Sequence, residues 1–238
     1  MEDGEIREVV AREIALFECA RPQITTDIGA VLVFSGPGTV IEPISIRDAE
    51  WMSWFDLRRV TLGISIVLKV TGLRLAKHLL DLTRNDVEQV GPYFIYNGVN
   101  SKHENEDLGA YFSLPRFRIP ESKLVLVDEV RDDDGSVREI KHTGDQLKSF
   151  PSHLLGNRIK GAIALVSNAP HFPRILRYMD YYRPIPEEFP IRCFPIHSDP
   201  EWATIYANSE IEALCRYLKV GFLSPNPYPA DLGLGSAS

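Results

Sequence analysis

The chain has 238 residues, of which 44% are hydrophobic and 25% are charged, the ordinary balance of a folded globular protein. Its 26 basic and 33 acidic residues give a formal net charge of −7. This balance argues against a nucleic-acid-binding protein, whose binding surface is basic, and against docking on an anionic membrane face. The length is that of a single domain with a sizeable core.

The first residues, the hydropathy and the cysteines predict a cytoplasmic protein. Residues 1–5 are acidic and lack the basic and apolar regions of a secretory signal. The most apolar stretch, residues 60–73, is shorter than the roughly 20 residues that cross a bilayer, so we expect no membrane span. Cys19, Cys193 and Cys215 are far apart and form no CxxC motif, which is typical of a reducing compartment.

Helical and strand patterns alternate along the chain. Apolar residues at near-helical spacing predict a helix over residues 5–20, which we expect to pack on the core. Residues 30–34 form a continuous apolar run, typical of a strand that is buried on both faces of a parallel sheet. Similar runs predict four further strands, over residues 93–96, 124–127, 162–166 and 191–196.

Helices are predicted between these strands. Asp48 predicts the start of a helix that continues through residue 57, and a second helix is expected over residues 73–82. Further helical patterns cover residues 104–112, 145–155, 172–181 and 209–218. Because strands that alternate with helices form parallel sheets, we predict a three-layer, Rossmann-like α/β fold with a central, mostly parallel sheet of about five strands.

The predicted organisation is one α/β domain with an added segment at each end and two interrupting segments. Residues 1–28 hold the amino-terminal helix, and residues 29–223 form the domain. Residues 39–70 are too long for a simple crossover, so we expect a helical insertion there. Residues 129–142 contain an acidic run that predicts a solvated turn in a hairpin, and residues 224–238, rich in Pro, Gly and Ser, are expected to be disordered.

Small and polar residues follow the predicted strands. In open α/β sheets a ligand binds beyond the carboxyl ends of the strands, where the strand order reverses. Small residues there allow a ligand to approach the backbone closely, so we predict a small-molecule crevice at this edge. Its predicted lining comprises Ser35, Gly36 and Gly38 after the first strand, Asn97 and Gly98 after the second, Glu129 after the third, and Ser167 and Asn168 after the fourth.

The densest polar group follows the fourth predicted strand. His171 and Arg174 are three residues apart, so both can lie on one face of the first helical turn. Arg174 has the fork geometry that binds a phosphate or a carboxylate, and His171 can donate a hydrogen bond or move a proton near neutral pH. The alternative is that His171 caps the loop and Arg174 pairs with a surface carboxylate.

Each of two other polar groups can be interpreted either as the start of a helix or as part of the crevice. Thr143 and Gln146 have the spacing of a capping box, so His142, Thr143 and Gln146 either close a helix start or line the crevice. Glu106 belongs to an acidic run that either begins a solvated helix or holds a ribose or an amine of the ligand. No short-range spacing of His, Cys, Asp and Glu predicts a metal site.

These elements together resemble the YdcF/SanA-like family over residues 29–200. Residues 167–174 read Ser-Asn-Ala-Pro-His-Phe-Pro-Arg, where the family has Thr-Ser-x-x-His-x-x-Arg. His142 and Gln146 stand where the family has Asn, so the polar contacts there are expected to differ. The resemblance implies a Rossmann-like fold, one shared pocket for these residues, and S-adenosylmethionine as a candidate ligand. It attaches no reaction to the family.

Three functions remain open at this point. The first is a protein that binds an anionic or an adenosyl or nucleotide-like ligand, S-adenosylmethionine included. The second is a hydrolase or transferase acting on a phosphorylated or carboxylated substrate, with His171 as general acid or base. The third is a non-catalytic interaction module that uses Trp51, Trp54 and Phe55, although their helical spacing also fits core packing or burial in a homodimer.

Overall fold

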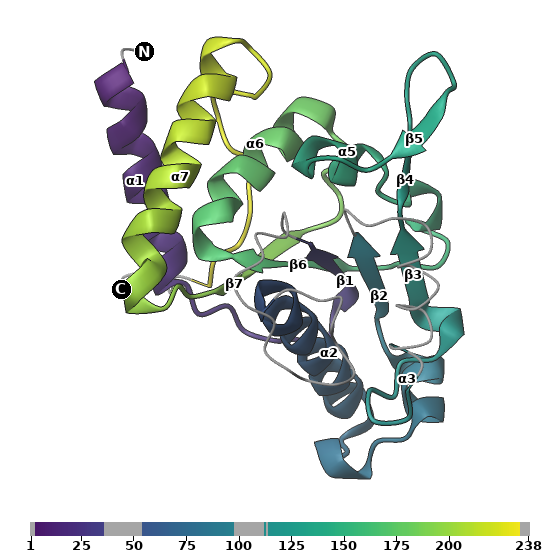
Figure 1. Cartoon of the computed structure of the whole chain (residues 1–238). Helices are drawn as coiled ribbons and strands as arrows, with labels where there is room; N and C mark the ends of the chain where they lie inside the picture. Colours follow the sequence, from purple (N-terminus) through teal and green to yellow (C-terminus); the bar gives the residue numbers. More distant parts are fainter. Residues whose placement is uncertain (1–2, 36–53, 98–111, 113, 234–238) are drawn as a thin grey trace.

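The computed structural model describes residues 3–35, 54–97, 112 and 114–233, and it has an α/β architecture of three layers. A central parallel sheet is covered by helices on both faces (Figure 1). The predicted fold class is therefore confirmed. The helix predicted over residues 104–112 lies almost entirely outside the described residues.

Five strands form the central sheet, in the order β3-β2-β1-β6-β7. Every neighbouring pair is parallel, so the carboxyl ends of all five strands lie at the same edge. The order reverses at β1, which pairs with β2 on one side and with β6 on the other. The gap between the ends of β1 and β6 is therefore the switch point of the sheet. The strands are β1 (Ile28–Phe34), β2 (Tyr93–Asn97), β3 (Leu124–Val127), β6 (Ala162–Asn168) and β7 (Ile191–Ile196).

Helix α2 (Trp54–Leu75), with the shorter α3 (Arg84–Val90), covers one face of the sheet. Its apolar side chains pack on inward-facing residues of β1, β2 and β6. Gly63 permits this close approach, because a Cβ there would lie 2.6 Å from the Val33 Cγ2 atom. Residues 54–70 are thus the crossover helix itself and not a separate cap, which corrects the predicted insertion for this part.

The rest of the predicted insertion, residues 36–53, lies outside the described residues, and Trp51 lies within it. Trp54 and Phe55 begin α2, but their side chains are also outside the description. The predicted use of these aromatic residues, in the core or at an interface, therefore stays a prediction. Likewise, the second helix expected over residues 73–82 is replaced by the end of α2 and a single short turn, η1 (Leu79–Asp81), because Ala76 adopts a positive φ of 52°.

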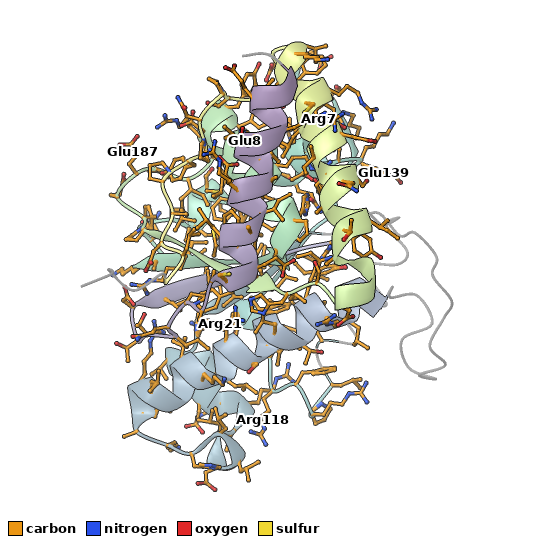
Figure 2. All side chains as sticks on the ribbon, turned by 90° about the vertical axis from the view of Figure 1, so that its left-hand side faces the viewer. Arg7, Glu8, Arg21, Arg118, Glu139 and Glu187 are labelled. Carbon is orange, nitrogen blue, oxygen red and sulfur yellow. The ribbon has the colours of Figure 1, made fainter. Side chains whose placement is uncertain are left out.

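Among the described residues, four helices cover the opposite face: α1 (Asp3–Cys19), α5 (Thr143–Lys148), α6 (Phe172–Tyr182) and α7 (Pro200–Lys219). Helices α1 and α7 run side by side, as both views show (Figure 1, Figure 2). The buried Arg177 of α6 donates to both carboxylate oxygens of Glu13 in α1, at 2.6 and 2.9 Å. The rings of Phe17 and Phe172 stack with centroids 5.0 Å apart. The first helix is therefore fixed to α6 by both charge and packing.

A small antiparallel hairpin, β4 (Glu129–Arg131) and β5 (Val137–Glu139), projects from the sheet beyond β3 (Figure 1). Arg138 ties it to α5, because its guanidinium donates to both carboxylate oxygens of Asp145 at 2.8 Å and also pairs with Asp132. The remaining short 3₁₀ turns are η2 (Glu121–Lys123), η3 (Ser152–Leu154) and η4 (Ala169–His171).

The carboxy-terminal segment up to residue 233 is placed against the sheet. The Asp231 N–H donates to the Ile191 carbonyl at 2.8 Å, and the Cys193 N–H donates to the Asp231 carbonyl at 3.1 Å. Tyr228 is buried in the core beside α6. The prediction of a disordered tail is therefore wrong for residues 224–233, because one aromatic anchor and backbone pairing outweigh the composition of the segment. Residues 234–238 lie outside the description.

Two further predictions concern membrane crossing and the state of the cysteines. Among the described helices, none combines the length and the apolarity that crossing a bilayer would require. Cys19, Cys193 and Cys215 are all free thiols, and the last two are buried. Burial raises the pKa of Cys193 well above its ordinary value, so this thiol stays protonated.

Gly161 directly precedes β6, at the point where the pairing of β1 with β6 begins, and a substitution there can test this pairing. Gly161 has a φ of 84°, and a Cβ there would overlap the Asp27 carbonyl oxygen, which accepts from the Ala162 N–H at 2.9 Å. Gly135 has nearly the same φ, 85°, with open space around it.

We predict that Gly161→Ala lowers the free energy of unfolding by at least about 2 kcal/mol more than Gly135→Ala does, since only the first substitution adds overlap to backbone strain. Urea denaturation of both variants measures the difference. An equal decrease in the free energy of unfolding for both variants would show that the backbone at the start of β6 is not packed against Asp27 as described.

Candidate ligand-binding site

Polar side chains gather at the switch point of the sheet. Ser35 directly follows β1, and Ser167 and Asn168 end β6. Helix α5 brings Thr143 and Gln146 to the same edge, the turn η4 brings His171, and α6 brings Arg174. The structure therefore joins seven of the predicted site residues: Ser35, Thr143, Gln146, Ser167, Asn168, His171 and Arg174.

His171 is at the centre of this group and is only 4% exposed. Its Nε2 atom lies 2.9 Å from the Thr143 hydroxyl, and its Nδ1 atom lies 3.0 Å from the Ser167 hydroxyl. Burial lowers the pKa of His171 well below 6.5, and the positive charges of Arg174 and Arg59 lower it further. The imidazole is thus neutral at physiological pH. A neutral ring has one donor and one acceptor nitrogen, so it donates to one hydroxyl and accepts from the other.

Helix α5 is attached to the end of β1 through Gln146. Its side-chain Nε2 donates to the carbonyl oxygen of Ser35 at 3.2 Å and to the Ser35 hydroxyl at 3.0 Å. Gln146 therefore does not close a capping box with Thr143, and the predicted cap is wrong. His142 is the N-cap residue instead, because its Nδ1 accepts from the Asp145 N–H at 3.2 Å.

The position of the N-cap, one residue earlier than predicted, has a direct effect on the site. With His142 at the cap, Thr143 becomes the first residue of α5 and its hydroxyl is free of the helix end, so it reaches His171. His142 itself is half-exposed and lies parallel to the Tyr178 ring, with centroids 6.5 Å apart. His142 thus orders the helix that carries Thr143 and Gln146.

Arg59, a buried residue of α2, joins the ends of the two central strands. Its Nη1 donates to the carbonyl oxygen of Phe34 at 3.1 Å, and its Nε donates to the Asn168 side-chain oxygen at 3.3 Å. Sequence reasoning missed this residue because it lies inside the predicted insertion. The signal that was available is a charged residue within the apolar face of a helix that follows a buried strand.

Arg174 and Glu210 form an ion pair beside this group. Arg174 Nη2 donates to Glu210 Oε1 at 2.9 Å, and the two side chains are only 16% and 19% exposed. Burial raises the pKa of Glu210, while the charges of Arg174 and Arg59 act in the opposite direction. The predicted alternative for Arg174, pairing with a carboxylate, is thus realised, but in a part-buried position next to His171. Glu210 of α7 was missed by the sequence analysis.

Of the other predicted site residues, only Glu129 and His142 have side chains that the structure describes. Gly36, Gly38, Gly98 and Glu106 lie outside the described residues, as does the side chain of Asn97 at the end of β2. Glu129 is exposed in the hairpin, opposite Glu139 of β5. Within the described ranges, no three His, Cys, Asp or Glu side chains are grouped as metal ligands would be.

An open groove of about 640 Å³ adjoins the site on the α2 side of the sheet. Pro195 and Ile196 of β7 form one wall, and they are the register partners of Ser167 and Asn168. The groove therefore begins beside the carboxyl end of β6. The remaining lining residues are Leu57, Arg58, Thr61, Leu62, Ser65 and His197.

Comparisons with protein-family models, curated proteins and solved structures find no match to this chain.

The neutral state of His171 has a consequence for stability that can be measured. Above pH 6.5 the folded and unfolded states are both neutral at this residue. Below pH 6.5 the unfolded chain takes up a proton that the folded protein excludes, so folding is opposed increasingly until the pH reaches the folded-state pKa.

We predict that the stability of the wild-type protein relative to His171→Gln falls by up to about 1.4 kcal/mol per pH unit as the pH is lowered below 6.5. Urea denaturation between pH 7.5 and 5 measures it. The exposed His153 provides the control, since His153→Gln should follow the wild-type pH dependence. A pH-independent difference for His171→Gln would contradict a buried neutral ring.

Proposed function

We propose that this protein binds an anionic small molecule beyond the carboxyl ends of β1 and β6. The observation that carries the proposal is the charge at this edge. Two guanidinium groups, Arg59 and Arg174, lie close enough to the buried His171 to lower its pKa. The imidazole stays neutral, so the positive charge at this edge belongs to the two arginines, of which Arg174 pairs with Glu210.

This positive charge is local, because the whole chain carries a net charge of −7. Charges that are partly withdrawn from water interact more strongly than charges on an open surface. Arg59 is 4% exposed and Arg174 has a side chain that is 16% exposed. An anion placed at this edge would therefore be stabilised by the charge of both residues, and Arg174 has the fork geometry to hydrogen-bond it.

Nucleotide-like ligands are the candidates that we favour within this class, because each carries a phosphate that can pair with Arg174. S-adenosylmethionine is a candidate outside this class, since it is a net cation whose carboxylate can still pair with Arg174. The adjoining groove of about 640 Å³ falls in the range of small-molecule sites and supports a ligand of that size. The resemblance to the YdcF/SanA-like family supports S-adenosylmethionine as this candidate.

Arg174 provides the direct test. We predict that Arg174→Gln weakens the binding of the ligand by about tenfold or more, because a hydrogen bond to a charged group is lost. Isothermal titration with S-adenosylmethionine, ATP and a nucleotide sugar measures this. Arg183→Gln is the matched control, since Arg183 ends the same helix, is exposed, and pairs with Asp180 and Glu187. No heat from any ligand at millimolar concentration, or equal affinities for the two variants, would contradict the proposal.

A hydrolase or transferase is the second candidate, and one observation favours it. A neutral imidazole that is hydrogen-bonded to two hydroxyls can take a proton from one of them, and Thr143 and Ser167 both supply such a group. If a screen of phosphate and carboxylate esters finds turnover, His171→Gln should lower kcat by about 10²-fold or more. Turnover that survives this substitution would assign His171 to positioning alone.

A further inference from the structure

We infer that the groove between α2 and the end of β7 holds an apolar ring or chain of the ligand, while Arg174 binds the ligand's anionic group. This inference rests on the proposed function, and it names the substrate class of the same site. The class is a phosphate or carboxylate that carries an aryl, base or alkyl substituent. Three features of the groove support it: its position, its lining and the fixation of its walls.

The groove directly adjoins the polar group at the switch point of the sheet. On the α2 wall, Arg58 lines the groove, and the next residue, Arg59, donates to the side chain of Asn168. On the β7 wall, Ile196 lines the groove and is the register partner of the same Asn168. Both walls therefore meet the polar group at Asn168, so one ligand can extend from this edge into the groove.

The lining of the groove is mostly apolar. Leu57 and Leu62 of α2 are only partly buried by the core, and Pro195 and Ile196 add apolar surface from β7. None of the described lining residues is acidic, so a cationic substituent would meet no opposite charge there. The volume of about 640 Å³ is in the range of sites that bind whole small molecules, so an anionic group alone would leave most of it unfilled. An apolar substituent is the occupant that this lining stabilises.

The walls of the groove are held in place by the protein itself. Arg58 of α2 donates to Asp199 Oδ2 at 3.0 Å, which attaches α2 to the segment that follows β7. The Ser198 N–H in that segment donates to the Glu18 carboxylate of α1 at 3.1 Å. The segment is therefore fixed by two helices. Because binding to a preformed groove orders few groups, apolar contacts made there contribute directly to affinity.

The experiment compares inorganic phosphate, phenyl phosphate and hexyl phosphate by isothermal titration. We expect the wild-type protein to bind both esters at least about tenfold more tightly than phosphate, the effect of burying about 60 Å² of apolar surface. Esters that bind where phosphate gives no measurable heat would support the inference equally.

Ser65→Phe tests where the apolar group lies, because Ser65 lines the groove and a phenyl ring there would occupy it. In this variant the esters should lose their advantage over phosphate. Leu73→Phe is the matched control, since Leu73 lies on the same helix, is 53% exposed and is not a lining residue. It should keep the wild-type preference. Thr61→Phe, at an exposed position of the groove, replaces Ser65→Phe if circular dichroism shows that the latter does not fold.

A wild-type protein that binds phosphate and its esters with equal affinity would overturn the inference and leave the proposed function standing. The same holds if the esters keep their advantage in the folded groove-filling variant. Failure of the wild type to bind any of the three probes would overturn the inference and the proposed function together.

Discussion

The parallel pairing of β1 with β6 is the contact on which the candidate site depends. The register from Val31↔Ala164 to Val33↔Val166 brings the ends of both strands to one edge. Because side chains alternate between the faces of a strand, Ser167 points to His171 and Asn168 points to Arg59. A slip of one residue would exchange these two faces, so the polar group on the α6 side and the arginine on the α2 side exist together only in this register.

Once this edge is formed, its electrostatics depend on keeping one ring uncharged. His171 is buried next to two guanidinium groups, and hydroxyls occupy both of its nitrogens. The neutral ring leaves the positive charge to Arg59 and Arg174, which are held by backbone, amide and carboxylate oxygens. The site thus combines a fixed polar network with two guanidinium groups at one edge of the sheet, the feature on which the proposed binding of an anion depends.

Sequence patterns predicted the sheet and seven of the nine residues that form the described site, for identifiable reasons. The five strands are continuous apolar runs, and Ser35, Ser167 and Asn168 were found because strand ends in a parallel sheet converge. Arg59 was missed because it lies inside the predicted insertion, and Glu210 was missed because the pattern of the long helix α7 does not show which of its polar residues faces inward. The cap of α5 was misplaced by one residue, since the imidazole of His142 can accept from the helix end as well as the Thr143 hydroxyl.

The segment along β7 has an implication for assembly. A parallel sheet exposes unpaired backbone groups on its two outermost strands, here β3 and β7, and such strands invite the addition of a further chain. Asp231 occupies the hydrogen-bonding positions between Ile191 and Cys193, so the outer side of β7 is already engaged by the chain's own terminus. A strand from a second molecule could pair with β7 only after this segment had dissociated from it. The segment around Asp231 therefore opposes polymerisation through this edge of the sheet.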